Sequence, residues 1–243
     1  MDYSSIKFSG RNNMEFFTTL RGRVKDYFKE NNITRYGNYK MVIKTIALIA
    51  MYFVPYLLFM FGVFDSLWIQ ALLWVIMGFG MAGIGFSVMH DANHGAYSKN
   101  ATVNKLLGLF ANVLGASATN WKIQHNVLHH SYTNVSGVDE DISPGNIMRF
   151  SPHQPRFKAH KYQHLYAWFL YALMTIQWST VKDFKQILRY KKMGLTKKVD
   201  KNFTKLFTHL LISKIVYYGY LIVLPILFTA TPWYFIILFY VLI

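Results

Sequence analysis

The sequence contains no cysteine. This absence excludes disulfides, thiolate zinc sites and cysteine-ligated iron–sulfur clusters, so any metal must be bound through nitrogen and oxygen. Acidic residues are also scarce, with 11 Asp and Glu against 26 Lys and Arg and a formal net charge of +15. Apolar residues are abundant instead, at 53% hydrophobic and 18% aromatic, and they form long uncharged runs. This composition is typical of a membrane protein rather than a soluble domain.

The distribution of the basic residues favours a membrane surface over a nucleic-acid partner. Nine Lys or Arg lie in residues 1–44, sixteen in residues 99–205, and the last is Lys214. None lies in the short connections after the first and third apolar runs. This asymmetry is the one that the positive-inside rule describes. We therefore expect the N-terminus and the basic segments to face the cytoplasm and its anionic leaflet, where each cation contributes about 1 kcal/mol of attraction.

The apolar runs predict an all-α, multi-pass membrane protein built from helix hairpins. Residues 41–64 and 67–89 are each long enough to span a bilayer, and Asp65-Ser66 joins them in a short turn. Residues 206–228 predict a third span, and residues 232–243 begin a fourth that reaches roughly half of the ~20 residues needed to cross. We expect from this incomplete span that the chain is the N-terminal portion of a longer protein.

Several residues inside these runs carry specific expectations. Pro55 predicts a kink, which membrane helices tolerate. Gln70 is expected to make a helix-packing hydrogen bond. Lys214 either snorkels to the interface or faces a partner helix. A group of small residues predicts a close helix approach in the second span: Gly78, Gly80, Gly83 and Gly85.

Residues 1–40 are interpreted as a basic cytosolic segment, preceding a membrane domain at 41–243. Within it, residues 14–29 predict a helix with an apolar face formed by Phe17, Leu20, Val24 and Phe28. This helix lies either on the membrane or packed on the protein as an ordinary surface helix.

Between the second and third spans, residues 90–205 are interpreted as a cytosolic metal-binding region. Residues 103–119 and 165–181 predict two interfacial helices, because they are apolar but too short or too interrupted to span. Residues 131–164 contain several Gly and Pro breakers and predict a loop. Such an arrangement keeps both histidine clusters of this region on one side of the membrane.

Five of the nine histidines lie in two clusters: His90, His94, His125, His129 and His130. On a helix, residues at i and i+4 project from one face, so each HxxxH pair presents two imidazoles together. On the same α-helical geometry, His130 lies about 100° further round than His129. Two such faces could surround a metal that accepts neutral imidazole, such as zinc, copper, iron or nickel. The competing interpretation is a set of interfacial histidines packed in a loop.

The remaining histidines carry weaker signals. His160 and His164 repeat the HxxxH spacing, but we interpret them as interfacial rather than as ligands. His153 and His209 are interpreted as structural.

The segments HDANH (90–94) and HNVLHH (125–130) resemble the first two histidine boxes of the membrane fatty acid desaturases. Gly95, Trp121 and the run 137–142 (GVDEDI) strengthen the resemblance. It is nearest to the linoleoyl-CoA, or front-end, type of acyl desaturase. The third histidine box of that family does not occur in this sequence, which puts the completeness of a di-iron centre in doubt.

The resemblance implies an oxygen-dependent desaturase that places a double bond in an acyl chain carried by coenzyme A or a lipid. Its implied cofactors are two non-haem iron ions, with dioxygen as co-substrate and the five clustered histidines as metal ligands. Residues 1–40 hold no cytochrome b5-like module, which implies a separate donor such as ferredoxin or cytochrome b5. Trp121 is a candidate for lining the acyl channel.

Four polar residues beside the boxes are candidates to orient the ligand histidines: Asp91, Asn126, Asp139 and Asp141. Metal-bound histidine usually donates its second ring N–H to a carboxylate or carbonyl. Simple solvation of the loop is the alternative for the two later aspartates.

Three other functions remain compatible with the sequence. One is a related histidine-box hydroxylase or ketolase acting on lipids or carotenoids. The second is a zinc-dependent membrane hydrolase. The third is a catalytically incomplete membrane protein that binds metal or partners through its histidines.

Overall fold

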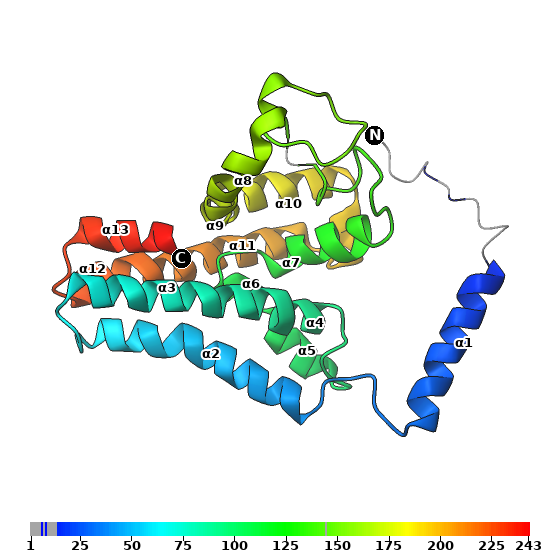
Figure 1. Cartoon of the computed structure of the whole chain (residues 1–243), viewed down its shortest axis with the longest axis horizontal. Coiled ribbons are helices and arrows are strands. Elements are labelled where there is room, and N and C mark those ends of the chain that lie inside the picture. Colours follow the sequence, from blue (N-terminus) through cyan, green and yellow to red (C-terminus); the bar gives the residue numbers. More distant parts are fainter. Residues whose placement is uncertain (1–5, 7, 9–13, 144) are drawn as a thin grey trace.

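A computed structural model of the chain describes residues 6, 8, 14–143 and 145–243, and within these ranges it is helical without a strand. The prediction of an all-α protein is therefore confirmed. Figure 1 shows a long helical body whose main helices run side by side, with a smaller group of helices and loops on one flank. Residues 1–5, 7, 9–13 and 144, and the predictions that concern them, lie outside the described part of the chain.

Among the residues that the structure describes, three helices are long and apolar enough to cross a membrane. The first is α2 (Tyr39–Met60), which starts where the Asn38 side chain accepts hydrogen bonds from the backbone amides of Lys40 and Met41. The other two are composite and contain π-helical turns. They are α3 (Leu67–Gly83) with η2 (Ile84–Met89) and α4 (His90–Asn93), and α11 (Phe203–Tyr218) with η7 (Gly219–Val223) and α12 (Leu224–Phe228).

The predicted spans agree with these helices to within a few residues at most ends. The exception is the second span, which continues through the first histidine cluster to Asn93. The last apolar run forms α13 (Trp233–Leu242), a shorter helix that lies beside α3 and α12 (Figure 1).

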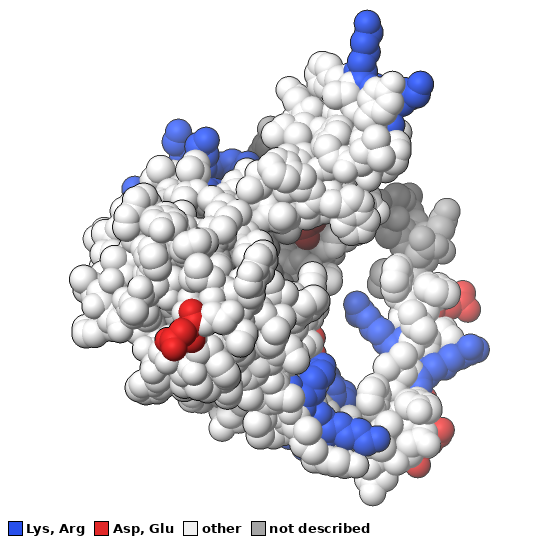
Figure 2. Space-filling model, turned by 60° about the vertical axis from the view of Figure 1, so that its left-hand side comes forward, with Lys and Arg blue, Asp and Glu red and all other residues white. Residues whose placement is uncertain are grey.

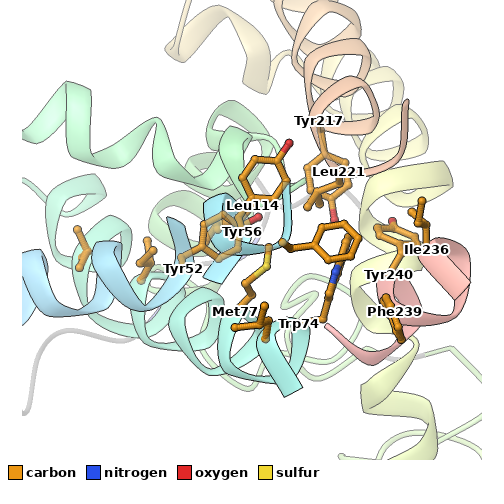
Figure 3. Close-up of a cluster of buried hydrophobic side chains, with 14 residues drawn as sticks. Tyr52, Tyr56, Trp74, Met77, Leu114, Tyr217, Leu221, Ile236, Phe239 and Tyr240 are labelled. Atoms are coloured by element: carbon orange, nitrogen blue, oxygen red, sulfur yellow. The ribbon is translucent and has the colours of Figure 1, made fainter. Parts of the chain in front are cut away.

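A core rich in aromatic residues joins these helices. Tyr52 from α2, Trp74 and Met77 from α3, Tyr217 from α11 and Phe239 from α13 meet in one buried cluster, as Figure 3 shows. The rings of Phe59 and Trp74 pack edge to face at 5.6 Å, a geometry that adds to the area they bury. Because four elements contribute to it, this cluster fixes their relative positions.

Gly80 marks the closest approach of α2 and α3. A Cβ at Gly80 would lie 2.7 Å from the backbone nitrogen of Tyr52, whereas one at Gly85 would meet nothing within 4 Å. The predicted close approach is therefore confirmed at Gly80 and does not extend to Gly85. Gln70 also behaves as expected, because its amide donates to the carbonyl of Phe64 at 2.9 Å and its oxygen accepts from the Thr231 hydroxyl at 2.9 Å.

The turns at 61–66 and 229–232 meet at one end of this bundle. The hydrogen bonds of Gln70 tie the turn at 61–66 to the turn at 229–232. Figure 2 looks toward that end, which is nearly free of Lys and Arg, while the basic side chains lie around the margin of the view. This matches the charge asymmetry of the sequence.

The segment expected as one interfacial helix at 103–119 is broken into three pieces. These are α5 (Ala101–Gly108), α6 (Phe110–Val113) and α7 (Ala118–Trp121), and the last continues into the π-helix η3 (Lys122–His129). The expectation of one continuous helix was wrong because Gly115 adopts φ +84° and ends the helix, after which the Asn112 side chain accepts from the amide of Ala118 at 2.8 Å.

The second expected interfacial helix, at 165–181, is longer than predicted. Helical structure runs through α8 (Gln163–Ala172), α9 (Met174–Gln177), η5 (Trp178–Lys182) and α10 (Asp183–Lys192), with η4 (Lys158–Tyr162) before it and η6 (Leu195–Lys198) after it. The basic stretch after residue 182 forms α10, which buries one face against the molecule through Gln186, Ile187 and Tyr190. Burial of this face stabilises α10 as a helix beyond the end of the predicted segment.

The predicted N-terminal helix is present as α1 (Met14–Glu30), and none of its residues is buried. Figure 1 shows it standing apart from the helical body. Its apolar side chains, among them Phe17, Leu20 and Val24, remain exposed. The alternative of a packed surface helix is not what the structure shows, and its placement on a membrane stays a prediction.

Candidate metal centre

The first histidine cluster lies at the end of the second long helix. The π-helical turn η2 leads into α4, and the amide of His94 donates to the carbonyl of His90 at 3.1 Å. The two rings therefore stand on one face, with centroids 4.6 Å apart. Gly95 then takes φ +70° and turns the chain away, so His94 is the last helical side chain.

The second cluster lies on a π-helix, not on the α-helix assumed from the spacing. The amide of His130 donates to the carbonyl of His125 at 3.0 Å, which is the i to i+5 bond of a π-helix. The wider turn brings His130 back toward His125, and their Nε2 atoms lie 3.2 Å apart. The α-helical geometry assumed for this cluster was therefore wrong, and the ring centroids of His125, His129 and His130 lie within 5.5 Å of one another.

The two clusters meet. His94 lies 5.2 Å from His125 and 4.8 Å from His130, measured between ring centroids. Two groups could each hold a metal ion, because within each group one ligand atom per residue lies within 4.8 Å of the others. The groups share one histidine and consist of His90, His94 and His125, and of His125, His129 and Asp141.

Carboxylates hold the outer nitrogen of three of these rings. The Nδ1 of His129 lies 3.1 Å from both carboxylate oxygens of Asp139, the Nδ1 of His125 lies 3.3 Å from Asp141, and the Nδ1 of His90 lies 3.0 Å from Asp91. Because an ionised carboxylate only accepts, each Nδ1 carries the proton in these contacts. The Nε2 lone pair of a neutral ring is then available to a metal.

Asp139 is itself fixed by the loop in which it lies. It is fully buried, and its carboxylate accepts from the backbone amides of Asn134 at 2.8 Å and Asp141 at 3.0 Å. A solvated loop residue would not be expected to have this environment. The loop thus orients His129 through a carboxylate whose own position is set by the backbone.

Asn126 has a different role from the one expected. Its side chain donates to the backbone carbonyl of Asn93 at 3.0 Å and so joins the second cluster to the first. Trp121 lies against the histidines, with ring centroids 4.5 Å from His125 and 5.5 Å from His90. Its indole forms an apolar wall beside the cluster, and a role in an acyl channel stays a prediction.

Partial burial lowers the pKa of two of the clustered imidazoles, those of His94 and His125. Desolvation, together with the neighbouring His90, His125 and His130, lowers the pKa of His94 to about 4, although Asp91 opposes the shift. Desolvation also lowers the pKa of His125, although Asp141 opposes that effect. A neutral imidazole is the form that binds metal, so both rings are in the ligand state at neutral pH.

A polar network that the sequence did not reveal supports the second cluster from behind. Gln124 donates to Asp141 at 2.5 Å, and Gln186 of α10 donates to Gln124 at 2.6 Å and to Glu140 at 2.8 Å. Glu140 also binds Arg189 and accepts from the Tyr190 hydroxyl at 2.9 Å. These partners lie far apart in the sequence, and no local pattern marks the glutamines.

The other histidines lie outside both groups within the part of the chain that the structure describes. His160 is buried, with its Nε2 2.9 Å from the carbonyl of Asn146 and its Nδ1 accepting from the amide of Phe157 at 3.2 Å. These backbone partners agree with a structural role for that ring. His153 and His209 are exposed on the surface.

Five imidazoles and a nearby carboxylate form a donor set of nitrogen and oxygen atoms. Such ligands suit iron as well as zinc or copper, so the residues fit a histidine-bound iron centre without selecting it alone.

The model of the fatty acid desaturase family matches residues 66–243, which include both histidine clusters and their carboxylates. The chain belongs to the fatty acid desaturase family.

Curated members of this desaturase family are similar over most of the chain. A sn-1 linoleoyl-lipid 6-desaturase of Arthrospira platensis is 38% identical over 173 residues, which cover 71% of this chain and 46% of that protein. A protein of the same name from a Synechocystis strain is 33% identical, covering 71% of this chain and 47% of its own length. An acyl-lipid (8-3)-desaturase of Physcomitrium patens is 33% identical, covering 74% and 38%.

The chain thus spans about half the length, or less, of these desaturases. No solved structure matches it.

Proposed function

We propose that the intact protein is an oxygen-dependent fatty acyl desaturase with a histidine-bound di-iron centre. The observation that carries this proposal is the convergence of histidines from two boxes at the end of the long apolar helices: His90, His94, His125 and His129 belong to the two candidate metal groups, and His130, outside both groups, lies against His94 and His125. Membership of the desaturase family supports it. The relatives are named for action on acyl lipids, which makes an acyl chain on a lipid or coenzyme A carrier the proposed substrate.

The reaction removes two hydrogens from adjacent methylene groups of the acyl chain. With two electrons and two protons from a donor, one dioxygen is reduced to two waters and the carbon–carbon bond becomes double. A methylene of this kind has no acidic proton, so acid–base side chains alone cannot activate it. The bound iron would supply the redox chemistry with dioxygen that the side chains lack.

The chain's own residues hold and orient this centre. His90, His94, His125, His129 and His130 are the proposed iron ligands, and Asp141 is within reach as an oxygen ligand. Asp91, Asp139 and Asp141 hold the Nδ1 protons so that the opposite nitrogens face inward. Trp121 excludes water from one side of the cluster with its indole.

The cluster is proposed to lie on the cytoplasmic face of the membrane. It stands at the opposite end of the spans from the turns at 61–66 and 229–232, which contain no Lys or Arg, and on the side where the basic segments lie. A metal site at the surface of the membrane would let the acyl chain of the substrate stay in the bilayer while its head group stays in water. An electron donor such as ferredoxin or cytochrome b5 would approach from the same side.

Metal analysis of the detergent-purified chain tests the proposal. Near-stoichiometric iron, lost when His94 and His129 are both changed to alanine, is expected. The matched control is His153→Ala with His209→Ala, which removes two exposed histidines outside both groups and should leave the iron unchanged.

Two other outcomes would redirect the assignment. Stoichiometric zinc in place of iron would contradict a redox mechanism and favour a metal-dependent hydrolase. Hydroxylated rather than unsaturated acyl products, measured on the protein supplied with a donor, would favour the hydroxylase branch of histidine-box enzymes.

A further inference from the structure

Lys214 lies near the middle of the third long helix, and only 4% of the residue is exposed. A lysine in such a segment is costly and usually faces a partner inside the protein. Lys214 faces three: its ammonium donates to Asp183 at 2.5 Å and to the carbonyls of Gly115 at 2.5 Å and Trp178 at 3.0 Å. Of the two alternatives left open by the sequence, the structure shows the partner-facing one.

The three partners come from the segments that flank the second histidine box. Gly115 lies in the break between α6 and α7. It immediately precedes the helix formed by α7 and η3, which carries the second histidine box and is called the box helix below. Trp178 and Asp183 lie in the continuous helical run of η5 and α10, which packs behind the same box. One ammonium group therefore joins the third span to both neighbours of the metal cluster.

Asn120 extends this contact into the box helix. Its side chain donates to the backbone carbonyl of Asp183 at 2.7 Å and to its carboxylate at 3.2 Å. Both residues are almost fully buried, at 1% and 3% exposure. Asn120 directly precedes Trp121 and lies five residues before His125, in the first turn of the helix that begins at Ala118, so it ties that first turn to Asp183 of α10.

Stability alone does not account for a buried ion pair at this position. Replacing such a pair by apolar side chains of similar volume is often neutral or stabilising, so its retention is better explained by a requirement for position. Here the pair also satisfies two backbone carbonyls and one asparagine amide: those of Gly115 and Asn120 precede the second box in the chain, and that of Trp178 lies in the helical run that packs against it. Lys214 and Asp183 therefore hold the segments around the second histidine box in fixed positions, and this set of contacts is called the anchor below.

We infer that Lys214 is a positioning residue of the metal centre, acting through Asp183 and Asn120 on the start of the helix that bears His125, His129 and His130. This inference rests on the proposed function, because the centre it positions is the one proposed there. Without the anchor, the box helix keeps its histidines but loses its fixed distance from His90 and His94.

The test uses the full chain in detergent, loaded with cobalt(II) as a spectroscopic probe. The double variant Asp183→Asn with Lys214→Met removes both charges at once and leaves no unpaired buried ion. We expect the cobalt affinity to fall about 10- to 100-fold, as for other residues that support metal ligands, and the cobalt absorption bands to shift. The carbonyls of Gly115 and Trp178 lose a donor, so the thermal midpoint of the metal-free chain should fall while the chain still unfolds in one cooperative transition.

The matched control is Asp200→Asn with Lys205→Met. This pair makes the same type of contact at 3.0 Å, but its lysine is 56% exposed, and the histidine that interacts with Asp200 is His209, outside both histidine clusters. It should keep the affinity and spectrum of the parent chain. A folded Asp183→Asn and Lys214→Met variant with unchanged affinity and spectrum would overturn the inference.

Asn120→Ala keeps the test decisive if the double variant does not fold, because it cuts the link to the box and leaves the ion pair intact. It should also weaken cobalt binding, and parent-like binding by this variant would equally overturn the inference. A parent chain that binds no metal would instead contradict the proposed function, so the two failures are distinguishable.

Discussion

Asp139 is fully buried although it lies in a polar loop, and this contrast defines its role. Two backbone amides and the Nδ1 of His129 occupy its carboxylate. Proximity to the second box made Asp139 and Asp141 visible as candidates in the sequence. The glutamines that support Asp141 were not visible, because Gln186 lies 62 residues from its partner Gln124 and carries no motif.

Asp139→Asn tests the role of this carboxylate. The amide cannot accept from two backbone N–H groups and from His129 as an ion does, and the loss of hydrogen bonds to a charged group costs about 1.5–3 kcal/mol. We expect weaker metal binding, by about 10- to 100-fold, with a lower thermal midpoint. Equilibrium dialysis against iron or cobalt measures the first and unfolding in detergent the second.

Asp65→Asn is the control for that substitution, because Asp65 is exposed in the turn between the first two spans. It should leave metal binding unchanged. Metal binding by Asp139→Asn equal to that of Asp65→Asn would show that the buried carboxylate does not support the centre.

At the scale of elements, the sequence predicted the long helices well and the histidine helices less well. Hydropathy and length are enough to locate α2 and the two composite spans. The HxxxH spacing alone did not predict the π-helical form of 122–129, in which the amide of His130 donates to the carbonyl of His125. Likewise, the break at Gly115 depends on a backbone conformation that no hydropathy pattern encodes.

Gly115→Ala should disturb this break more than a simple glycine substitution would. Gly115 has φ +84°, which costs an L-residue roughly 1–2 kcal/mol, and a Cβ there would lie 2.6 Å from the Tyr217 ring. Overpacking of this kind adds about 1–3 kcal/mol. We expect a clear drop in the thermal midpoint and some loss of metal binding.

Gly62→Ala separates the two causes, since Gly62 has φ +62° but nothing within 4 Å of its Cβ position. It should show the backbone cost alone. Equal midpoints for the two alanine variants would mean that the Tyr217 contact relaxes without cost.

Gly80→Ala tests the packing of α2 on α3. Its Cβ would meet backbone atoms of Met51 and Tyr52 at 2.9 and 2.7 Å, and backbone cannot move aside as a flexible side chain can. The helices must separate, so we expect destabilisation of about 1–3 kcal/mol. Unfolding in detergent measures it, and Gly85→Ala, with open space at its Cβ, should be neutral. A neutral Gly80→Ala would argue against the tight contact.

For the whole molecule, charge and hydropathy predicted the class of fold and the side on which the histidines lie relative to the turns. They did not predict that the ammonium of Lys214 joins the third span to α10, or that α1 stands clear of the bundle. Both depend on which surfaces meet in three dimensions. The proposed orientation in the membrane, with the histidines on the cytoplasmic side, rests on charge asymmetry alone. It is open to direct measurement.

The absence of cysteine makes that measurement simple, because each introduced cysteine is the only thiol in the chain. Four exposed positions are suitable: Ser66 and Ala230 in the two turns without Lys or Arg, and Lys99 and Lys158 on the basic side. We expect a membrane-impermeant maleimide to label cysteine at Ser66 and Ala230 in intact cells, and at Lys99 and Lys158 only after permeabilisation. The physical reason is that the basic segments stay with the anionic cytoplasmic leaflet. The opposite pattern would place the histidines outside the cytoplasm, and equal labelling at all four positions would contradict the crossing of the membrane by α2 and α3.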